Sequence, residues 1–309
     1  MGTPDFAVPS FNLIAESNHE IISVFTQPDR SKGRHSKLSF PPVKEAAIRR
    51  NIDVIQPQRI SRDKDAINYI KKESPDLIVV VAYGHILSDE ILKVPKYGCI
   101  NLHASLLPKY RGASPIQGAI LAGDEETGVT IMELDSGVDT GDILSQKKVR
   151  IEDRNAVELS EKLAQVGAIL LLETIDELEE GSVVPKKQDE DSATHVDMIS
   201  KSDGEVNFEK DSALDIERKL RAYYEWPGIY LEREKGNIKI KDGYVIRNKF
   251  TEEVEQKPGK VLNTSNEGID VICRNGVFRI KSIQMPGKKA LSAKDFLLGH
   301  RVKKGDYFL

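Results

Sequence analysis

Runs of apolar residues alternate with helical patterns through the first part of the chain. Short runs rich in β-branched residues are typical of strands buried on both faces, and they lie at residues 21–26, 53–56, 77–82, 98–103 and 129–134. Apolar residues at helical spacing lie between and after them, at residues 42–50, 63–73, 115–122 and 155–180. This alternation predicts an α/β fold with an open, mostly parallel, Rossmann-like sheet.

The pattern then changes along the chain. Residues 186–204 are polar and show no periodicity, which is typical of a linker. Beyond them, a helical stretch precedes short strands, and Asp242-Gly243 and Asn275-Gly276 each lie between two of these strands. Such dipeptides favour two-residue hairpin turns. The sequence therefore predicts a catalytic domain at 1–185, a linker at 186–204 and a β-barrel domain at 205–309.

The first residues resemble a turn that has lost its strand. The segment from Met1 to Phe6 has the composition of a turn that follows a first strand, yet no apolar run precedes it. The absence of that strand would leave the backbone groups of its neighbours unpaired in the middle of the sheet. We therefore expect that the natural start lies upstream of Met1.

Composition narrows the class of protein. The chain has 309 residues, and the hydrophobic share of 39% and charged share of 30% are those of a globular protein. The only cysteines are Cys99 and Cys273, far apart, which predicts neither a disulfide framework nor a cysteine zinc site. No apolar run is long enough for a membrane span, and no secretory signal is visible. We expect a cytoplasmic protein that does not bind a membrane.

Charge is divided unevenly between the two parts. Residues 206–309 carry 21 Lys and Arg against 15 Asp and Glu, although the whole chain has a net charge of −4. A basic C-terminal part beside an acidic N-terminal part is compatible with an anionic partner and equally with a solvated surface.

Two polar residues on one predicted strand are candidates for catalysis. Asn101 and His103 are two positions apart in residues 98–103, so their side chains point to the same face. They also lie at the carboxyl end of the strand, where open α/β sheets bind ligands. An amide that donates to an oxyanion and an imidazole that moves protons suit acyl transfer. A buried structural histidine is the alternative interpretation of His103.

A turn rich in glycine and aspartate follows the next strand. Asp135, Asp139 and Asp142 lie within eight residues, and their spacing does not match a calcium loop. Aspartates in such turns commonly bond backbone groups. The alternative is that one of these carboxylates lies against His103 and orients its ring.

Seven short motifs are distributed along the chain: Gly2-Thr-Pro-Asp-Phe6, Phe25-Thr-Gln-Pro-Asp29, Val81-Ala-Tyr-Gly84, Asn101-Leu-His103, Ser105-Leu-Leu-Pro-Lys-Tyr-Arg-Gly112, Asp139-Thr-Gly-Asp142 and Trp226-Pro-Gly228. In the order and spacing of these motifs, the sequence resembles the methionyl-tRNA formyltransferase family over nearly the whole chain.

The resemblance implies the formyltransferase fold with a C-terminal OB-like β-barrel that helps to hold tRNA. It implies 10-formyltetrahydrofolate as the formyl donor and initiator methionyl-tRNA as the acceptor. By motif position, the catalytic residues are Asn101, His103 and Asp139. The reduced folate is expected beside Ser105, Leu106, Leu107, Pro108, Tyr83 and Gly84.

A basic segment fits a tRNA partner. Residues 30–37 contain four cations in a predicted loop, and basic loops bind phosphates, although many are simply solvated. The resemblance implies that this loop inserts at the acceptor end of tRNA, with Arg34 as the main contact and Lys32 and Lys37 beside it.

Other chemistries are not expected. The six histidines show no metal-ligand spacing, and no Gly-x-Gly-x-x-Gly motif is present, so we expect neither a metal nor a dinucleotide. Two alternatives stay open: a folate-dependent formyltransferase acting on a small-molecule amine, and a tRNA-binding protein without catalysis. The chain is expected to be a monomer.

Overall fold

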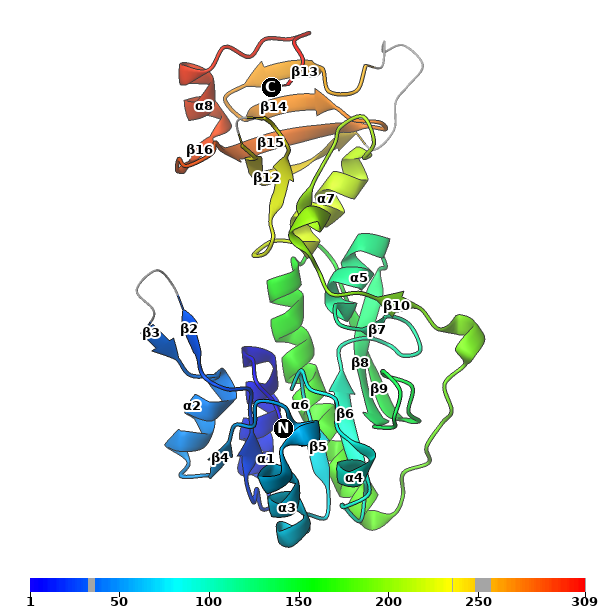
Figure 1. The fold of residues 1–309 in the computed structure, drawn as a ribbon. Coiled ribbons are helices and arrows are strands. Elements are labelled where there is room, and N and C mark those ends of the chain that lie inside the picture. Colours follow the sequence, from blue (N-terminus) through cyan, green and yellow to red (C-terminus); the bar gives the residue numbers. More distant parts are fainter. Residues whose placement is uncertain (33–36, 235, 248–256, 309) are drawn as a thin grey trace. The chain divides into compact units, whose positions relative to one another are not determined.

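The computed structural model describes residues 1–32, 37–234, 236–247 and 257–308 (Figure 1). The chain divides into two compact units. The first contains Met1–Pro115, Glu125–Ile151 and Leu159–Asp197, and the second contains Ile116–Asp124, Glu152–Glu158 and Met198–Leu309.

Each predicted strand of the first unit is present, although most are shorter than the apolar runs that predicted them. Strand β1 (Val24–Phe25) pairs in parallel with β4 (Val54–Ile55), and β5 (Ile78–Val80) pairs in parallel with β6 (Cys99–His103). Strands β8 (Glu126–Glu133) and β9 (Ile143–Arg150) extend the second of these sheets in antiparallel orientation. The carboxyl end of β6 therefore lies between a parallel and an antiparallel neighbour.

Met1 and Gly2 join the two pairs of parallel strands. The Gly2 amide donates to the Phe25 carbonyl at 2.9 Å, and the Met1 amino group donates to the Val79 carbonyl at 2.6 Å. Burial lowers the pKa of this amino group to about 5. Strands β1 and β5 belong to separate sheets. A cavity of about 340 Å³, lined mainly by apolar side chains, lies beside Met1 and Gly2.

Among the residues that the structure describes up to 180, the helices match the predicted helical stretches closely and include two that the pattern did not predict. Helix α3 (Lys64–Glu73) begins after Asp63, whose carboxylate accepts from the Ala66 amide. Among the described residues, no helix is long and apolar enough to cross a membrane. The remaining helices are α1 (Val8–Ala15), α2 (Pro42–Arg49), α4 (Asp89–Leu92), α5 (Pro115–Ala122) and α6 (Ala156–Glu180), with 3-10 turns at Asp5–Ala7 and Ile60–Arg62.

The second unit is built on an antiparallel sheet (Figure 1). Its strands run in the order β11 (Ile229–Leu231), β12 (Ile238–Arg247), β15 (Val277–Gln284), β14 (Gly268–Ile272) and β13 (Val261–Ser265), and β16 (Ala290–Ser292) also pairs with β15. Helices α7 (Ala213–Ala222) and α8 (Ala293–Gly299) belong to this unit, as does the 3-10 turn Lys201–Gly204.

One of the two predicted hairpins is correct. Asn275-Gly276 joins β14 to β15, with the Cys273 amide bonded to the Gly276 carbonyl at 3.0 Å. The prediction for Asp242-Gly243 was wrong, because these residues lie inside β12 at irregularities in its register with β15. A side chain at Gly243 would collide with the Phe278 ring and the Arg279 carbonyl, so this glycine permits a bulge and not a turn.

Candidate functional site

The two polar residues of β6 lie in different surroundings. His103 is 6% exposed, and its Nε2 lies 2.9 Å from the Tyr110 carbonyl. A carbonyl can only accept, so Nε2 carries the hydrogen of this bond. Asn101 is half-buried, and its amide has no hydrogen-bond partner in the described part of the chain. One strand therefore presents a fixed imidazole and an amide that is available to a ligand.

Asp139 lies against His103. Its Oδ2 is 3.6 Å from His103 Nδ1 and accepts a hydrogen bond from the Gly112 amide at 2.8 Å. The distance to Nδ1 is longer than a hydrogen bond, so the carboxylate and the imidazole face each other across a narrow gap. With Nε2 bonded to Tyr110, Nδ1 is the nitrogen that can exchange a proton there.

Hydrogen bonds to its backbone hold the turn that carries Asp139. Asp139 has a φ of +56°, a left-handed conformation that costs a non-glycine residue about 1–2 kcal/mol. The Gln188 side-chain amide donates to the carbonyls of Asp139 and Gly141, each at 2.8 Å. Asp135 bonds the Gly137 amide and the Thr140 hydroxyl within the turn, which is the structural role expected of aspartate there.

The segment from Ser105 to Pro108 is tied to the sheet by Thr130. The Thr130 hydroxyl donates to the Ser105 carbonyl at 2.6 Å and accepts from the Leu107 amide at 3.1 Å. The side chains of Ser105 and Leu107 are buried, whereas Leu106 and Pro108 are partly exposed. Only the latter two thus offer side-chain surface to a ligand in this segment.

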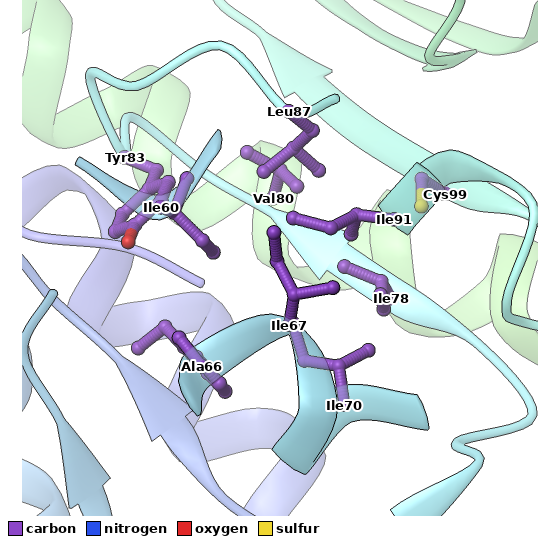
Figure 2. Close-up of a cluster of buried hydrophobic side chains, with 11 residues drawn as sticks. Ile60, Ala66, Ile67, Ile70, Ile78, Val80, Tyr83, Leu87, Ile91 and Cys99 are labelled. Carbon is purple, nitrogen blue, oxygen red and sulfur yellow. The ribbon is translucent and has the colours of Figure 1, made fainter. Parts of the chain in front are cut away.

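Tyr83 packs in a hydrophobic cluster of the first unit. Its side chain is 1% exposed and lies with Ile60 and Val80 in the close-up of this cluster (Figure 2). Burial raises the pKa of its phenol, which therefore stays neutral. The Tyr83 carbonyl accepts from Gln27 Nε2 at 3.2 Å. A ligand beside Tyr83 and Gly84 would therefore meet the backbone of these residues.

Residues 188–196, which were expected to belong to a linker, run back across the first unit; we call them the strap. Strand β10 (His195–Val196) pairs in parallel with β7 (Arg111–Gly112). Gly112 has a φ of +108°, and any side chain there would collide with the Val196 carbonyl. The strap also contains a 3-10 turn at Glu190–Ser192.

Arg111 is a buried cation beneath this strap. Its side chain is 2% exposed, and its guanidinium donates to Gln188 Oε1 and to both carboxylate oxygens of Glu190 at 2.7–3.0 Å. Such a charge requires partners. A buried arginine is therefore expected to have acceptors. The pattern of residues 186–204, however, did not identify Gln188 and Glu190 as those acceptors.

The basic segment forms part of a hairpin. Strand β2 (Arg30–Lys32) pairs with β3 (Lys37–Ser39), and this pairing brings Lys32 opposite Lys37. Arg34 lies outside the described residues. At the base of the hairpin, Lys44 of α2 donates to both oxygens of Asp29, at 2.8 and 2.7 Å, and to Gln56 Oε1.

Within the described ranges, no group of three or more His, Cys, Asp or Glu side chains could hold a metal ion. The structure brings His103 and Asp139 together and places Asn101 two positions earlier on the same strand. It adds Tyr110, Gly112 and Gln188 as groups that hold this pair, none of which the sequence pattern identified.

Comparison with known families covers most of the chain. The family model described as formyl transferase matches residues 1–175, and the model described as formyl transferase, C-terminal domain, matches residues 198–301. The methionyl-tRNA formyltransferase of Clostridium tetani is 45% identical over 307 residues, which cover 99% of this chain and 97% of the relative. That of Sulfurihydrogenibium sp. is 42% identical over 309 residues, with coverage of 99% and 98%.

Solved structures share the fold. WlaRD, a sugar 3N-formyl transferase solved with dTDP and 5-N-formyl-THF, has a TM-score of 0.67 at 20% identity and covers 93% of this chain and 97% of its own. HypX from Aquifex aeolicus in complex with tetrahydrofolic acid has a TM-score of 0.56 at 20% identity, covering 82% of this chain and 43% of that one.

Proposed function

The chain belongs to the methionyl-tRNA formyltransferase family, and from this premise we propose that it transfers the formyl group of 10-formyltetrahydrofolate to the α-amine of initiator methionyl-tRNA. The observation that carries the proposal is the His103–Asp139 pair, whose Nδ1 and Oδ2 atoms face each other at 3.6 Å at the end of a strand. The same strand bears Asn101, whose amide has no hydrogen-bond partner among the described residues. This arrangement supplies an oxyanion donor and a route for a proton, which formyl transfer to an amine requires.

In this mechanism, the neutral amine attacks the formyl carbon. An α-amine has a pKa of about 7.7–8.0, so a substantial fraction is neutral near pH 7. The new N–C bond forms as the carbonyl becomes an oxyanion, which Asn101 stabilises together with His103 protonated at Nδ1. Asp139 holds His103 and helps to move a proton from the attacking nitrogen to N10 of the folate. The C–N10 bond then breaks and releases tetrahydrofolate.

The binding roles follow the same proposal. The folate lies along Ser105, Leu106, Leu107 and Pro108 and against the backbone of Tyr83 and Gly84. Buried residues in this segment shape the loop, and the partly exposed Leu106 and Pro108 supply apolar contact. The Thr130 bonds, which fix the segment to β8, support its use as a rigid wall.

We further assign tRNA binding to the hairpin that contains Lys32, Arg34 and Lys37 and to the second domain. Residues 1–185 form the catalytic domain in this scheme, and 205–309 form an OB-like barrel for which the antiparallel sheet of the second unit is suitable. The enzyme acts as a monomer in the cytoplasm, where initiator tRNA is used.

Transfer of a labelled formyl group tests the function. Initiator methionyl-tRNA should be formylated far faster than elongator methionyl-tRNA or a panel of small amines that includes amino-sugar nucleotides. Faster reaction with a small amine would overturn the proposal in favour of the alternative suggested by the fold shared with sugar formyltransferases. Retained tRNA binding without any transfer would assign the chain to binding alone.

Substitution of the strand residues tests the mechanism. Asn101→Ala and His103→Ala should each lower kcat by about 10²–10³-fold, the usual cost of an oxyanion donor. His19→Ala is a matched control, because His19 pairs with Asp176 at 2.8 Å elsewhere on the first unit. Circular dichroism should be unchanged in all three variants. Near-normal kcat in either strand variant would remove that residue from the mechanism.

A further inference from the structure

The groups that orient the catalytic pair all come from one short segment. His103 Nε2 is bonded by the Tyr110 carbonyl, and Asp139 Oδ2 is bonded by the Gly112 amide. Residues 110–112 therefore hold the His103 imidazole through the Tyr110 carbonyl and the Asp139 carboxylate through the Gly112 amide. Their own position sets the gap of 3.6 Å between the two side chains.

That segment is in turn held by the strap. The Tyr110 amide donates to the Thr194 hydroxyl at 2.8 Å, and the Arg111 amide donates to the Thr194 carbonyl at 2.8 Å. The Ala113 amide donates to the Val196 carbonyl at 3.0 Å. The strap thus supplies the hydrogen-bond partners that the edge of residues 110–113 requires.

Gln188 is the strap residue that reaches both sides of the pair. Its amide nitrogen bonds the carbonyls of Asp139 and Gly141, while its oxygen accepts from Arg111 Nε and Nη2. Both N–H donors and both oxygen lone pairs of this amide are therefore engaged. One side chain therefore joins the turn that carries Asp139 to the segment that holds His103.

We propose that Gln188 is a positioning residue for catalysis. By bridging the Asp139 turn and Arg111, it sets the distance between the Asp139 carboxylate and the His103 imidazole. This inference rests on the proposed function. Gln188 is not in contact with the reacting atoms and acts only through Asp139 and residues 110–112. A displacement of a catalytic group by about 1 Å can cost up to about 10²-fold in rate.

Gln188→Glu separates positioning from support of the fold. The carboxylate keeps an acceptor for Arg111 but loses both donors, and it places negative charge against the Asp139 and Gly141 carbonyls. We expect kcat for initiator methionyl-tRNA to fall by about tenfold or more, while KM for both substrates stays within about twofold. The acid limb of the kcat–pH profile should also shift, because the His103–Asp139 geometry changes.

Two further variants serve as controls. Glu190→Gln removes a carboxylate from Arg111 but leaves the Gln188 bonds to the turn, so it should lower the thermal midpoint and leave kcat and the pH profile unchanged. Lys187→Ala, at the exposed neighbouring position, should change neither. If Gln188→Glu lowers only the thermal midpoint, Gln188 has a structural role alone and the inference is wrong.

The outcome is separable from that of the proposed function. Absence of formyl transfer by the unmodified enzyme contradicts the function itself. Normal transfer by the unmodified enzyme, together with an unchanged kcat and pH profile in Gln188→Glu, contradicts only the positioning role. Should Gln188→Glu fold poorly, Gln188→Met removes the same two donors without adding charge and should give the same loss of kcat.

Discussion

Two clusters of the first unit share a composition: each contains a cation, a carboxylate and a glutamine. Arg111 lies with Glu190 and Gln188, and Lys44 lies with Asp29 and Gln56. In both, the glutamine amide also bonds a main-chain carbonyl, at Asp139 in the first and at Gln27 in the second. The clusters differ in what their backbone bonds hold in place.

In the first cluster only Gln188 bonds the turn that carries Asp139, whereas the Lys44 cluster holds the base of the β2–β3 hairpin. Asp29 directly precedes β2, and Phe40, whose ring lies 4.2 Å from Lys44 Nζ, directly follows β3. Similar side-chain chemistry thus lies beside the proposed catalytic pair in one place and beside the proposed tRNA-binding hairpin in the other. Activity measurements distinguish these roles better than stability measurements do.

The largest effect on kcat is expected at Asp139, whose turn is bonded by Gln188 of the strap. Asp139→Asn removes the carboxylate opposite His103 but keeps an oxygen for the Gly112 amide, so kcat should fall by about 10²-fold or more, within the usual range for a group that takes part in proton transfer. Asp135→Asn, in the same turn, should change kcat by less than about twofold, because asparagine serves equally in such turns. Single-turnover rates at saturating folate measure both. A larger loss of kcat in Asp135→Asn than in Asp139→Asn would show that Asp139 is not the catalytic carboxylate.

An intermediate effect is expected at the hairpin. Lys44→Met keeps an apolar stem against Phe40 but loses the bonds to Asp29, so kcat/KM for initiator methionyl-tRNA should fall by about tenfold, the scale of about 1.4 kcal/mol. KM for the folate should not change. Lys71→Met, which breaks the exposed Lys71–Glu90 pair, is the matched control and should have no effect.

A double-mutant cycle sharpens this assignment. If Lys44 acts by placing the hairpin, its effect on kcat/KM should largely vanish when Arg34 is already replaced by alanine. Additive losses from Lys44→Met and Arg34→Ala would show that the two residues act separately and would contradict the support role.

The same residues illustrate which features the sequence pattern can predict. Alternation along β6 correctly placed Asn101 and His103 at the end of a strand, because strand periodicity is a local property. The Asp-rich turn suggested that one of its three carboxylates lies against His103, and only the resemblance selected Asp139. Gln188 could not be placed, since a polar side chain that bonds backbone groups across a turn leaves no periodic pattern. Gly243 was taken for a turn residue because a close approach of Phe278 is not visible in its neighbours along the chain.

The smallest effect concerns acid stability. Hydrogen bonds from Lys44 and Gln56 hold the pKa of Asp29 below its ordinary value. The folded state therefore binds fewer protons than the unfolded state, and the contribution is present above the unfolded pKa of about 3.9 and lost as pH falls through the folded value. Urea unfolding of the unmodified protein and Lys44→Met should differ by about 1 kcal/mol at pH 7 and converge at low pH. A difference that grows on acidification would contradict this origin.

The pairing of β10 with β7 has a consequence for recombination of this enzyme. Consider a chimera of two related enzymes joined at residue 185. It would take Asn101, His103 and Asp139 from one parent enzyme and the strap, residues 188–196, from the other. Mismatches at Gln188, Thr194 or Val196 would then misalign chemistry that is encoded far upstream. An exchange point beyond Asp197 transfers the proposed catalytic residues and their brace as one inherited block.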